Sequence, residues 1–180
     1  MAATKHTLVA LVQDKPGVLN RMASLFRRRG FNIESIAVGR SELPHFSRMT
    51  IVINGAATLV EQVRKQLDKV IDVVKVSDIT ESNMVARELA LIKVKATSAT
   101  RSEIMQIVDI FRANIIDVAA DSVTVEVTGD EEKVDSLFNL LRGFGIKEVA
   151  RTGCIAMTRG SQGALSVEEK LSKAHNKKQK

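Results

Sequence analysis

The chain contains neither tryptophan nor tyrosine, and it has only one cysteine and three histidines. With six phenylalanines as its other aromatic residues, it offers few platforms on which single-stranded nucleic acid could stack. No apolar run is long enough to cross a membrane. Cys154 cannot form a disulfide within the chain, and its apolar, strand-like surroundings are typical of a buried thiol. These absences predict a cytoplasmic protein with no membrane partner.

The residue patterns of metal sites and of common catalytic sites are also missing. His6, His45 and His175 are scattered, and no Cys/His or carboxylate cluster has metal-ligand spacing. Neither a GxxxxGKS/T phosphate loop nor a GxGxxG turn between a strand and a helix occurs. The sequence therefore predicts no catalytic residue and no metal ligand, and it favours a binding module. An enzyme in its own right is the alternative.

A net charge of +6 suggests nucleic-acid binding as a further alternative, but the position of the charge argues against it. Residues 161–180 hold five lysines and two glutamates, which leaves 22 basic and 19 acidic residues in the rest of the chain. A tail rich in Lys, Ser, Gln and Asn is typical of a solvated segment. We expect residues 160–180 to be a basic, disordered tail, and we expect no nucleic-acid partner.

The spacing of apolar residues predicts the same order of elements twice. In the first half it predicts strands at 7–12, 33–39, 47–53 and 70–77 and helices at 17–29 and 59–68. In the second half it predicts strands at 88–96, 114–119, 122–128 and 146–157 and helices at 101–112 and 131–142. Both halves read βαββαβ, which is the ferredoxin-like order. The predicted fold class is α+β, with two consecutive ferredoxin-like domains at 4–78 and 87–159 and a polar linker at 79–86.

Two short motifs of the capping-box type mark predicted helix starts. They pair Thr58 with Glu61 and Thr100 with Glu103. In such a box the threonine oxygen accepts a hydrogen bond from a free backbone N–H, and the glutamate reaches back to the cap residue.

The turn between the first predicted strand and the first predicted helix is the strongest candidate for a binding site. Asp14 can accept hydrogen bonds, Pro16 fixes φ, and Gly17 lets another group approach the backbone closely. The free N–H groups at the start of the following helix can hold a carboxylate. The same residues would also suit an ordinary strand-to-helix turn that is capped without a ligand.

Longer stretches around this turn resemble a known family. The motif Asp-x-Pro-Gly-Val-Leu at 14–19 is similar to the ACT domain, a module that binds small amino acids. The stretches RGFNIESI at 29–36 and SRMTI at 47–51 resemble the regulatory (small) subunit of acetolactate synthase, also called acetohydroxyacid synthase. The resemblance covers residues 4–160 and continues through 66–73, 87–94, 111–118 and 149–153.

The resemblance implies an N-terminal ACT domain, an ACT-like C-terminal domain and a homodimer formed through the ACT domain. In this family the effector is usually valine, held between the first strand–helix loop of one subunit and the start of the second strand of the other. The matching positions are Asp14, Gly17, Val18, Asn20, Asn32 and Ile33. An ammonium group would meet Asp14, backbone N–H groups would meet the carboxylate, and Val18, Ile33 and Ile36 would line a small apolar pocket. Asp14 and Asn20 depart from the Asn and Ser that are common in the family.

The resemblance also implies a non-catalytic subunit with a catalytic partner. Such a subunit binds and activates the large subunit and confers feedback inhibition by valine in the biosynthesis of valine, leucine and isoleucine. Thiamine diphosphate, Mg and FAD would belong to the large subunit, and this chain would hold no cofactor. The alternative is a stand-alone ACT-type sensor of small amino acids acting on another target, which would not need residues 87–158 to resemble the family.

Overall fold

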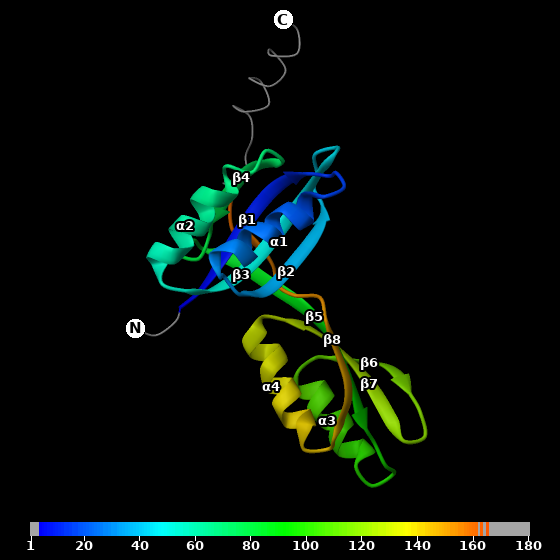
Figure 1. Cartoon of the computed structure of the whole chain (residues 1–180). Helices are drawn as coiled ribbons and strands as arrows, with labels where there is room; N and C mark the ends of the chain where they lie inside the picture. Colours follow the sequence, from blue (N-terminus) through cyan, green and yellow to red (C-terminus); the bar gives the residue numbers. More distant parts are fainter. Residues whose placement is uncertain (1–3, 162, 164, 166–180) are drawn as a thin grey trace, which may run out of the picture. The chain divides into compact units, whose positions relative to one another are not determined.

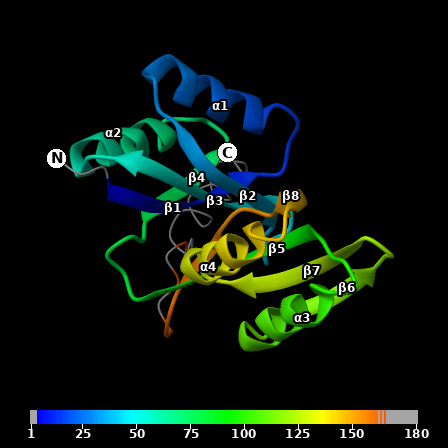
Figure 2. The ribbon, with the colours of Figure 1, turned by 90° about the horizontal axis from the view of Figure 1, so that it is seen from below.

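The computed structural model describes residues 4–161, 163 and 165, and these residues form two units. The first unit contains the described residues up to Val85 together with those from Ile155 onward, and the second is Ala86–Cys154. In each unit, two helices accompany one sheet (Figures 1 and 2). The prediction of two ferredoxin-like βαββαβ units is confirmed.

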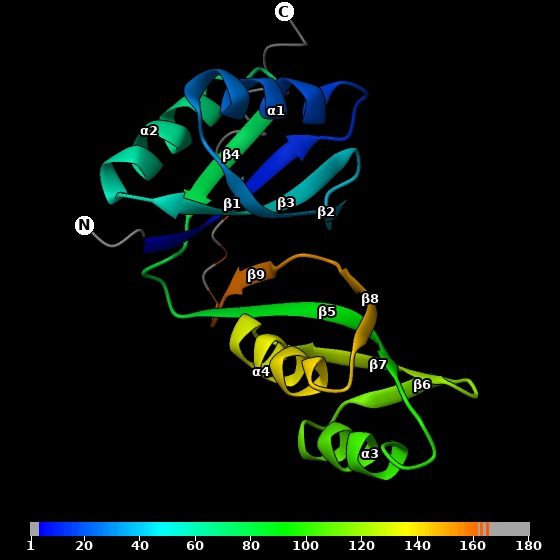
Figure 3. The same ribbon diagram turned by 60° about the horizontal axis from the view of Figure 1, so that its bottom comes forward.

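The first unit is a two-layer structure. Its elements are β1 (Thr4–Gln13), α1 (Val18–Arg29), β2 (Ile33–Arg40), β3 (Phe46–Gly55), α2 (Ala57–Leu67) and β4 (Val73–Asp78). The sheet is antiparallel in the order β2-β3-β1-β4, and both helices lie on one of its faces (Figure 3). This order leaves β2 and β4 at the two edges of the sheet.

The core of the first unit lies between the helices and the sheet. Alternate residues of β1 and β3 point toward the helices because side chains alternate between the faces of a strand. On α1, buried side chains recur at helical spacing, so that one stripe of the helix faces the sheet. The buried members from these three elements include Leu8, Ala10, Val12, Met49, Ile51, Ile53, Val18, Met22, Leu25 and Phe26.

The second unit repeats this plan. Its elements are β5 (Met84–Lys95), α3 (Arg101–Ile110), β6 (Asn114–Val118), β7 (Ser122–Gly129), α4 (Glu131–Arg142) and β8 (Ile146–Arg151). The antiparallel strands have the order β6-β7-β5-β8. Ile92 and Val125, which are paired across β5 and β7, form its core with Ile104 of α3 and Leu137 of α4.

The predicted strand 146–157 is wrong as a single strand. It is divided at residues 152–154 into β8 and β9 (Ile155–Thr158). Both strands pair with β5, and β9 also packs with the first unit. There Ala156 N donates to Thr50 Oγ1 (3.4 Å), and Arg48 Nη2 donates to the Ala156 carbonyl (2.8 Å). Arg48 and Thr50 alternate with the core residues of β3, so β9 lies on the helix-free face of the first sheet (Figure 3). The predicted second domain, 87–159, includes β9, and this boundary stays a prediction.

The segment predicted as a linker, 79–86, also belongs largely to folded structure. Ile79 is buried and its N–H donates to the Thr7 carbonyl (3.0 Å), while β5 begins at Met84. Arg159 N, just after β9, donates to the Asn83 carbonyl (2.7 Å). Most of the predicted tail, 160–180, lies outside the described residues.

Neither predicted capping box forms. Helix α2 begins one residue before Thr58, with Ala56 as its cap, and Glu61 pairs with Arg64 instead of reaching back. Thr100 does occupy the cap position of α3, but its hydroxyl accepts a hydrogen bond from Thr97 N (3.0 Å) and caps no helical N–H. In both cases a competing partner nearby takes the polar side chain.

Candidate functional site

The turn from Asp14 to Gly17 connects β1 to α1 and is held by backbone hydrogen bonds. Asp14 N donates to the His45 carbonyl (2.8 Å), and Lys15 N donates to the Gln13 carbonyl (3.0 Å). Gly17 is the N-cap residue of α1 and has φ +88°, a left-handed conformation that favours glycine. The turn predicted from the sequence is therefore present and needs its glycine.

The start of α1 is suited to an anion. Gly17 supplies no side-chain cap, and the first turn of the helix contains no acidic residue. The first N–H groups of a helix have no partner within it, and the positive end of the helix dipole lies there. Helix α2 shares this lack of a side-chain cap and of early acidic residues. At the cap of α1 the backbone is open to close approach, because a Cβ atom at Gly17 would meet nothing within 4 Å.

The six predicted site residues fall into two groups in one chain. Asp14, Gly17 and Asn20 are exposed around the start of α1. Val18 lies beside them, but its side chain is buried in the core, so only its backbone can face a ligand. Asn32, which is exposed, and Ile33, which is half-buried, lie beyond the other end of α1.

The two groups are separated by the length of this helix. Helix α1 has 12 residues and is therefore about 18 Å long. A single chain does not bring the two groups together around one small molecule. A site that uses both groups needs two chains, with the turn supplied by one and the start of β2 by the other.

One contact beside the turn was not predicted from the sequence. Asp72, in the connection between α2 and β4, is only 7% exposed and pairs with Arg21 of α1. The backbone oxygen of Asp72 also accepts a hydrogen bond from Gln13 N (2.8 Å) at the end of β1. Arg21 and Asp72 are 51 positions apart, so no local pattern in the sequence could indicate the pair.

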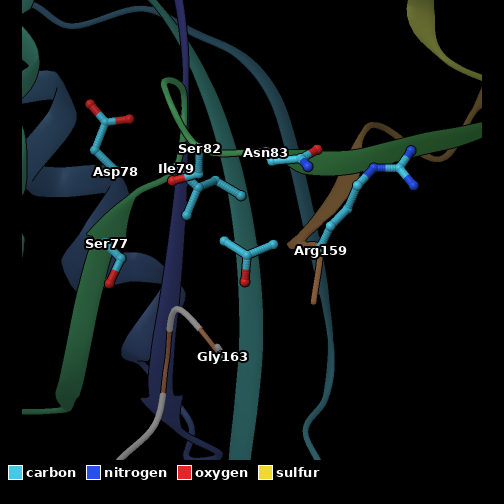
Figure 4. A pocket seen from close by; sticks show the side chains of 8 residues that line it. Ser77, Asp78, Ile79, Ser82, Asn83, Arg159 and Gly163 are labelled. Atoms are coloured by element: carbon cyan, nitrogen blue, oxygen red, sulfur yellow. The ribbon is translucent and has the colours of Figure 1, made fainter. Parts of the chain in front are cut away.

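Two hollows in the first unit lie away from these residues. One has a volume of about 400 Å³, and Figure 4 shows Asp78 and Arg159 on opposite sides of it. Asp78 Oδ1 accepts from Thr80 N (2.9 Å) and Arg159 Nε donates to the Met84 carbonyl (3.3 Å), so both charged groups are engaged by the fold. The other, of about 280 Å³, is lined by Phe31 and by side chains of α2 and the turn after it. The six predicted residues line neither hollow.

The second unit contains a partly buried ion pair of its own. Glu88, 8% exposed, pairs with Arg151, which also bonds Asp135 (2.8 Å). The hydrogen bond from Arg151 to Glu88 is the main cause that raises the pKa of Arg151 above its usual value. Burial raises the pKa of the Cys154 thiol, which disfavours the reactive thiolate. Both features are structural in character.

A metal-binding cluster and a membrane-spanning helix are both absent from the described residues. Among them, no three His, Cys, Asp or Glu side chains are grouped so that they could hold a metal ion. In the part of the chain that the structure describes, every helix is too short or too polar to span a bilayer.

Comparison with known proteins assigns both units to one family. A family model described as "AHAS small subunit-like ACT domain" matches residues 8–75, and one described as "Small subunit of acetolactate synthase" matches residues 87–160. The chain belongs to the acetolactate synthase small-subunit family. The resemblance inferred from the sequence is therefore confirmed, and so is the ACT character of the first unit.

Individual relatives match this chain over nearly their whole length. The chain is 58% identical to the "Probable acetolactate synthase small subunit" of Archaeoglobus fulgidus, over 88% of this chain and 99% of that protein. It is 50% identical to the "Acetolactate synthase small subunit" of Mycobacterium bovis, over 91% and 97%. The crystal structure of the acetolactate synthase small subunit from Thermotoga maritima matches with a TM-score of 0.81 and 44% identity, over 88% and 99%.

Proposed function

We propose that this chain is the regulatory subunit of an acetolactate synthase. It binds and activates the large catalytic subunit, and it confers feedback inhibition by valine in branched-chain amino-acid biosynthesis. The observation that carries the proposal is the match of both units, 8–75 and 87–160, to one small-subunit family. A stand-alone sensor would need only the first of these matches.

In this proposal the chain performs no chemistry itself. Thiamine diphosphate, Mg and FAD reside on the large subunit, and this chain changes the activity of that subunit by binding it. Cytoplasmic location and the lack of a nucleic-acid partner stay predictions from the sequence.

The proposed effector site lies between two copies of the chain. The turn at Gly17 supports this proposal through its open space and its uncapped helix start, where N–H groups can donate to the carboxylate of valine. Asp14 is exposed at the same turn and can accept from the ammonium group. Asn32 and Ile33 of the second copy complete the site because they cannot reach the turn within one chain.

Strand β2 is the proposed contact between the two ACT domains. It is an edge strand of the first sheet, and an edge presents backbone groups that can pair with another strand. Its side chains Ile36 and Val38 are 41% and 46% exposed, and they would be covered by a second copy. The start of this strand carries Ile33, so the dimer contact and half of the effector site adjoin.

Effector binding then regulates the enzyme by linkage. Valine bound across the dimer favours one arrangement of the two ACT domains. If the large subunit binds the other arrangement more tightly, valine weakens activation by the ratio of those affinities.

The proposal is tested by measuring acetolactate formation by the large subunit of the same organism, with and without this chain, across a valine titration. Titrations with leucine and isoleucine identify the effector, and the chain assayed alone tests whether it is catalytic. We expect activity that rises with the chain and then falls with valine. Activation that ignores all three amino acids would refute the effector site, and no activation by a folded chain would favour the stand-alone sensor.

A further inference from the structure

Asp72 anchors both ends of the turn that we assign to the effector. Its backbone oxygen accepts a hydrogen bond from Gln13, the last residue of β1 and the residue before the turn. Its carboxylate accepts from the guanidinium of Arg21, one helical turn after Gly17. Arg21 N in turn donates to the Gly17 carbonyl (3.0 Å). One residue of the α2–β4 connection therefore fixes where the turn begins and how α1 starts.

The pairing is asymmetric in its exposure. The side chain of Asp72 is 10% exposed, whereas that of Arg21 is 53% exposed. A carboxylate removed from water is costly unless a partner compensates it, so Asp72 holds Arg21 firmly while Arg21 remains at the surface beside the turn. The planar guanidinium also fixes the orientation of the pair, because its N–H groups form directed hydrogen bonds with the carboxylate.

We propose that Asp72 and Arg21 are positioning residues for the effector site. By holding the start of α1 against the end of β1, the pair keeps the first turn of α1, which has no side-chain cap, in place beside Gly17, where we propose that the ligand carboxylate binds. The inference rests on the proposed function of the turn. It adds that effector affinity depends on a residue of the α2–β4 connection that does not touch the ligand.

The test measures the dissociation constant for valine by calorimetry on the full chain, together with urea unfolding. The variants are Asp72→Asn, Arg21→Gln and the double variant, with Gly17→Asp as the reference for loss of the site. Arg64→Gln is the matched control, because it breaks an arginine–carboxylate pair with Glu61 on α2, away from the turn. Arg21 is half exposed, so Arg21→Gln carries the test if Asp72→Asn does not fold.

We expect each single variant to bind valine about 2- to 30-fold more weakly, which is the range for mutations that act on a site through intermediate contacts. The double variant should bind valine no more weakly than whichever single variant binds it less tightly, because the two side chains act as one unit. The control should keep its affinity for valine.

Three results would overturn the inference in distinguishable ways. If Gly17→Asp binds valine normally, the turn is not the effector site, and the inference falls with it. If Gly17→Asp loses binding while Asp72→Asn and Arg21→Gln lose only stability, the turn binds valine and the pair is merely structural. If Arg21→Gln weakens binding and Asp72→Asn does not, Arg21 acts on the ligand directly through its charge.

Discussion

Replacing Gly17 by asparagine and by aspartate would separate the role of the turn in folding from its role in binding. Gly17 has φ +88°, and a Cβ atom there would meet nothing within 4 Å. Neither side chain therefore clashes, and the cost to folding is that of the left-handed backbone, about 1–2 kcal/mol or less, since Asn and Asp tolerate this region best. The two variants should lose similar free energies of unfolding, with Gly17→Asp the more stable by up to about 1 kcal/mol because its charge lies at the positive end of the helix dipole.

The two variants should differ sharply in their response to valine. Asn and Asp have nearly the same size, but Asp adds a negative charge where we place the carboxylate of the ligand. Two charges 4 Å apart repel by about 4 kcal/mol at an effective dielectric constant of 20. Screening by salt at this exposed turn reduces the repulsion. We still expect Gly17→Asp to bind valine at least about tenfold more weakly than Gly17→Asn.

The assay compares the inhibition constant for valine in the assembled enzyme with urea unfolding of the chain alone. Gly145→Asp is the control, because Gly145 also has a left-handed φ of +96° but lies in the second unit. It should lose stability and keep its valine response. Equal inhibition constants for Gly17→Asn and Gly17→Asp would refute the placement of a carboxylate at this turn.

Three other predictions concern stability. Thr50→Val should lower the free energy of unfolding by about 1 kcal/mol, because it leaves the Ala156 N–H without its acceptor; unchanged hydrogen exchange at Ala156 would contradict this. Glu88→Gln should cost about 1–3 kcal/mol, because Arg151 loses the buried charge it pairs with, and an unchanged melting temperature would refute it. A hydrogen bond from a neighbouring arginine lowers the pKa of Glu61 to about 2. The stability that Glu61 adds to the fold is therefore present above its unfolded pKa and is lost as the pH falls toward 2. Between about pH 4.5 and 2, the free energy of unfolding of Glu61→Gln should fall less steeply than that of the unchanged chain, and identical curves would contradict the assignment.

Most of the fold could be predicted because apolar spacing reports which face of each element is buried. In β7 the strict alternation from Val123 to Thr128 matches a strand with one covered face. On α4, Val134, Leu137 and Leu141 mark the stripe that faces the core. The turn at Gly17 could be predicted because proline and glycine restrict the backbone in recognisable ways.

The remaining features depend on contacts that leave no periodic signal. Ile155–Thr158 continues the apolar pattern of β8, so nothing in the sequence separates β9 from the preceding strand or assigns it to the first unit. The pairing of Asp72 with Arg21 joins two polar residues that are distant in sequence. The prediction of capping boxes was wrong because hydroxyl and carboxylate groups can form hydrogen bonds with several nearby partners. Whether Asn32 meets Gly17 depends on a second chain.

The packing of β9 on the first sheet makes the ACT unit discontinuous in the chain, and this sets the order in which the protein can fold during synthesis. Domains generally fold as they leave the ribosome, the N-terminal one first. Here the N-terminal unit cannot be complete at Val85, because the strand that covers its helix-free face is translated only after the whole second unit. The second unit, which is continuous, can finish first. A fragment that stops at the end of β4 would therefore contain all four strands of the first sheet but lack the strand that packs on its helix-free face.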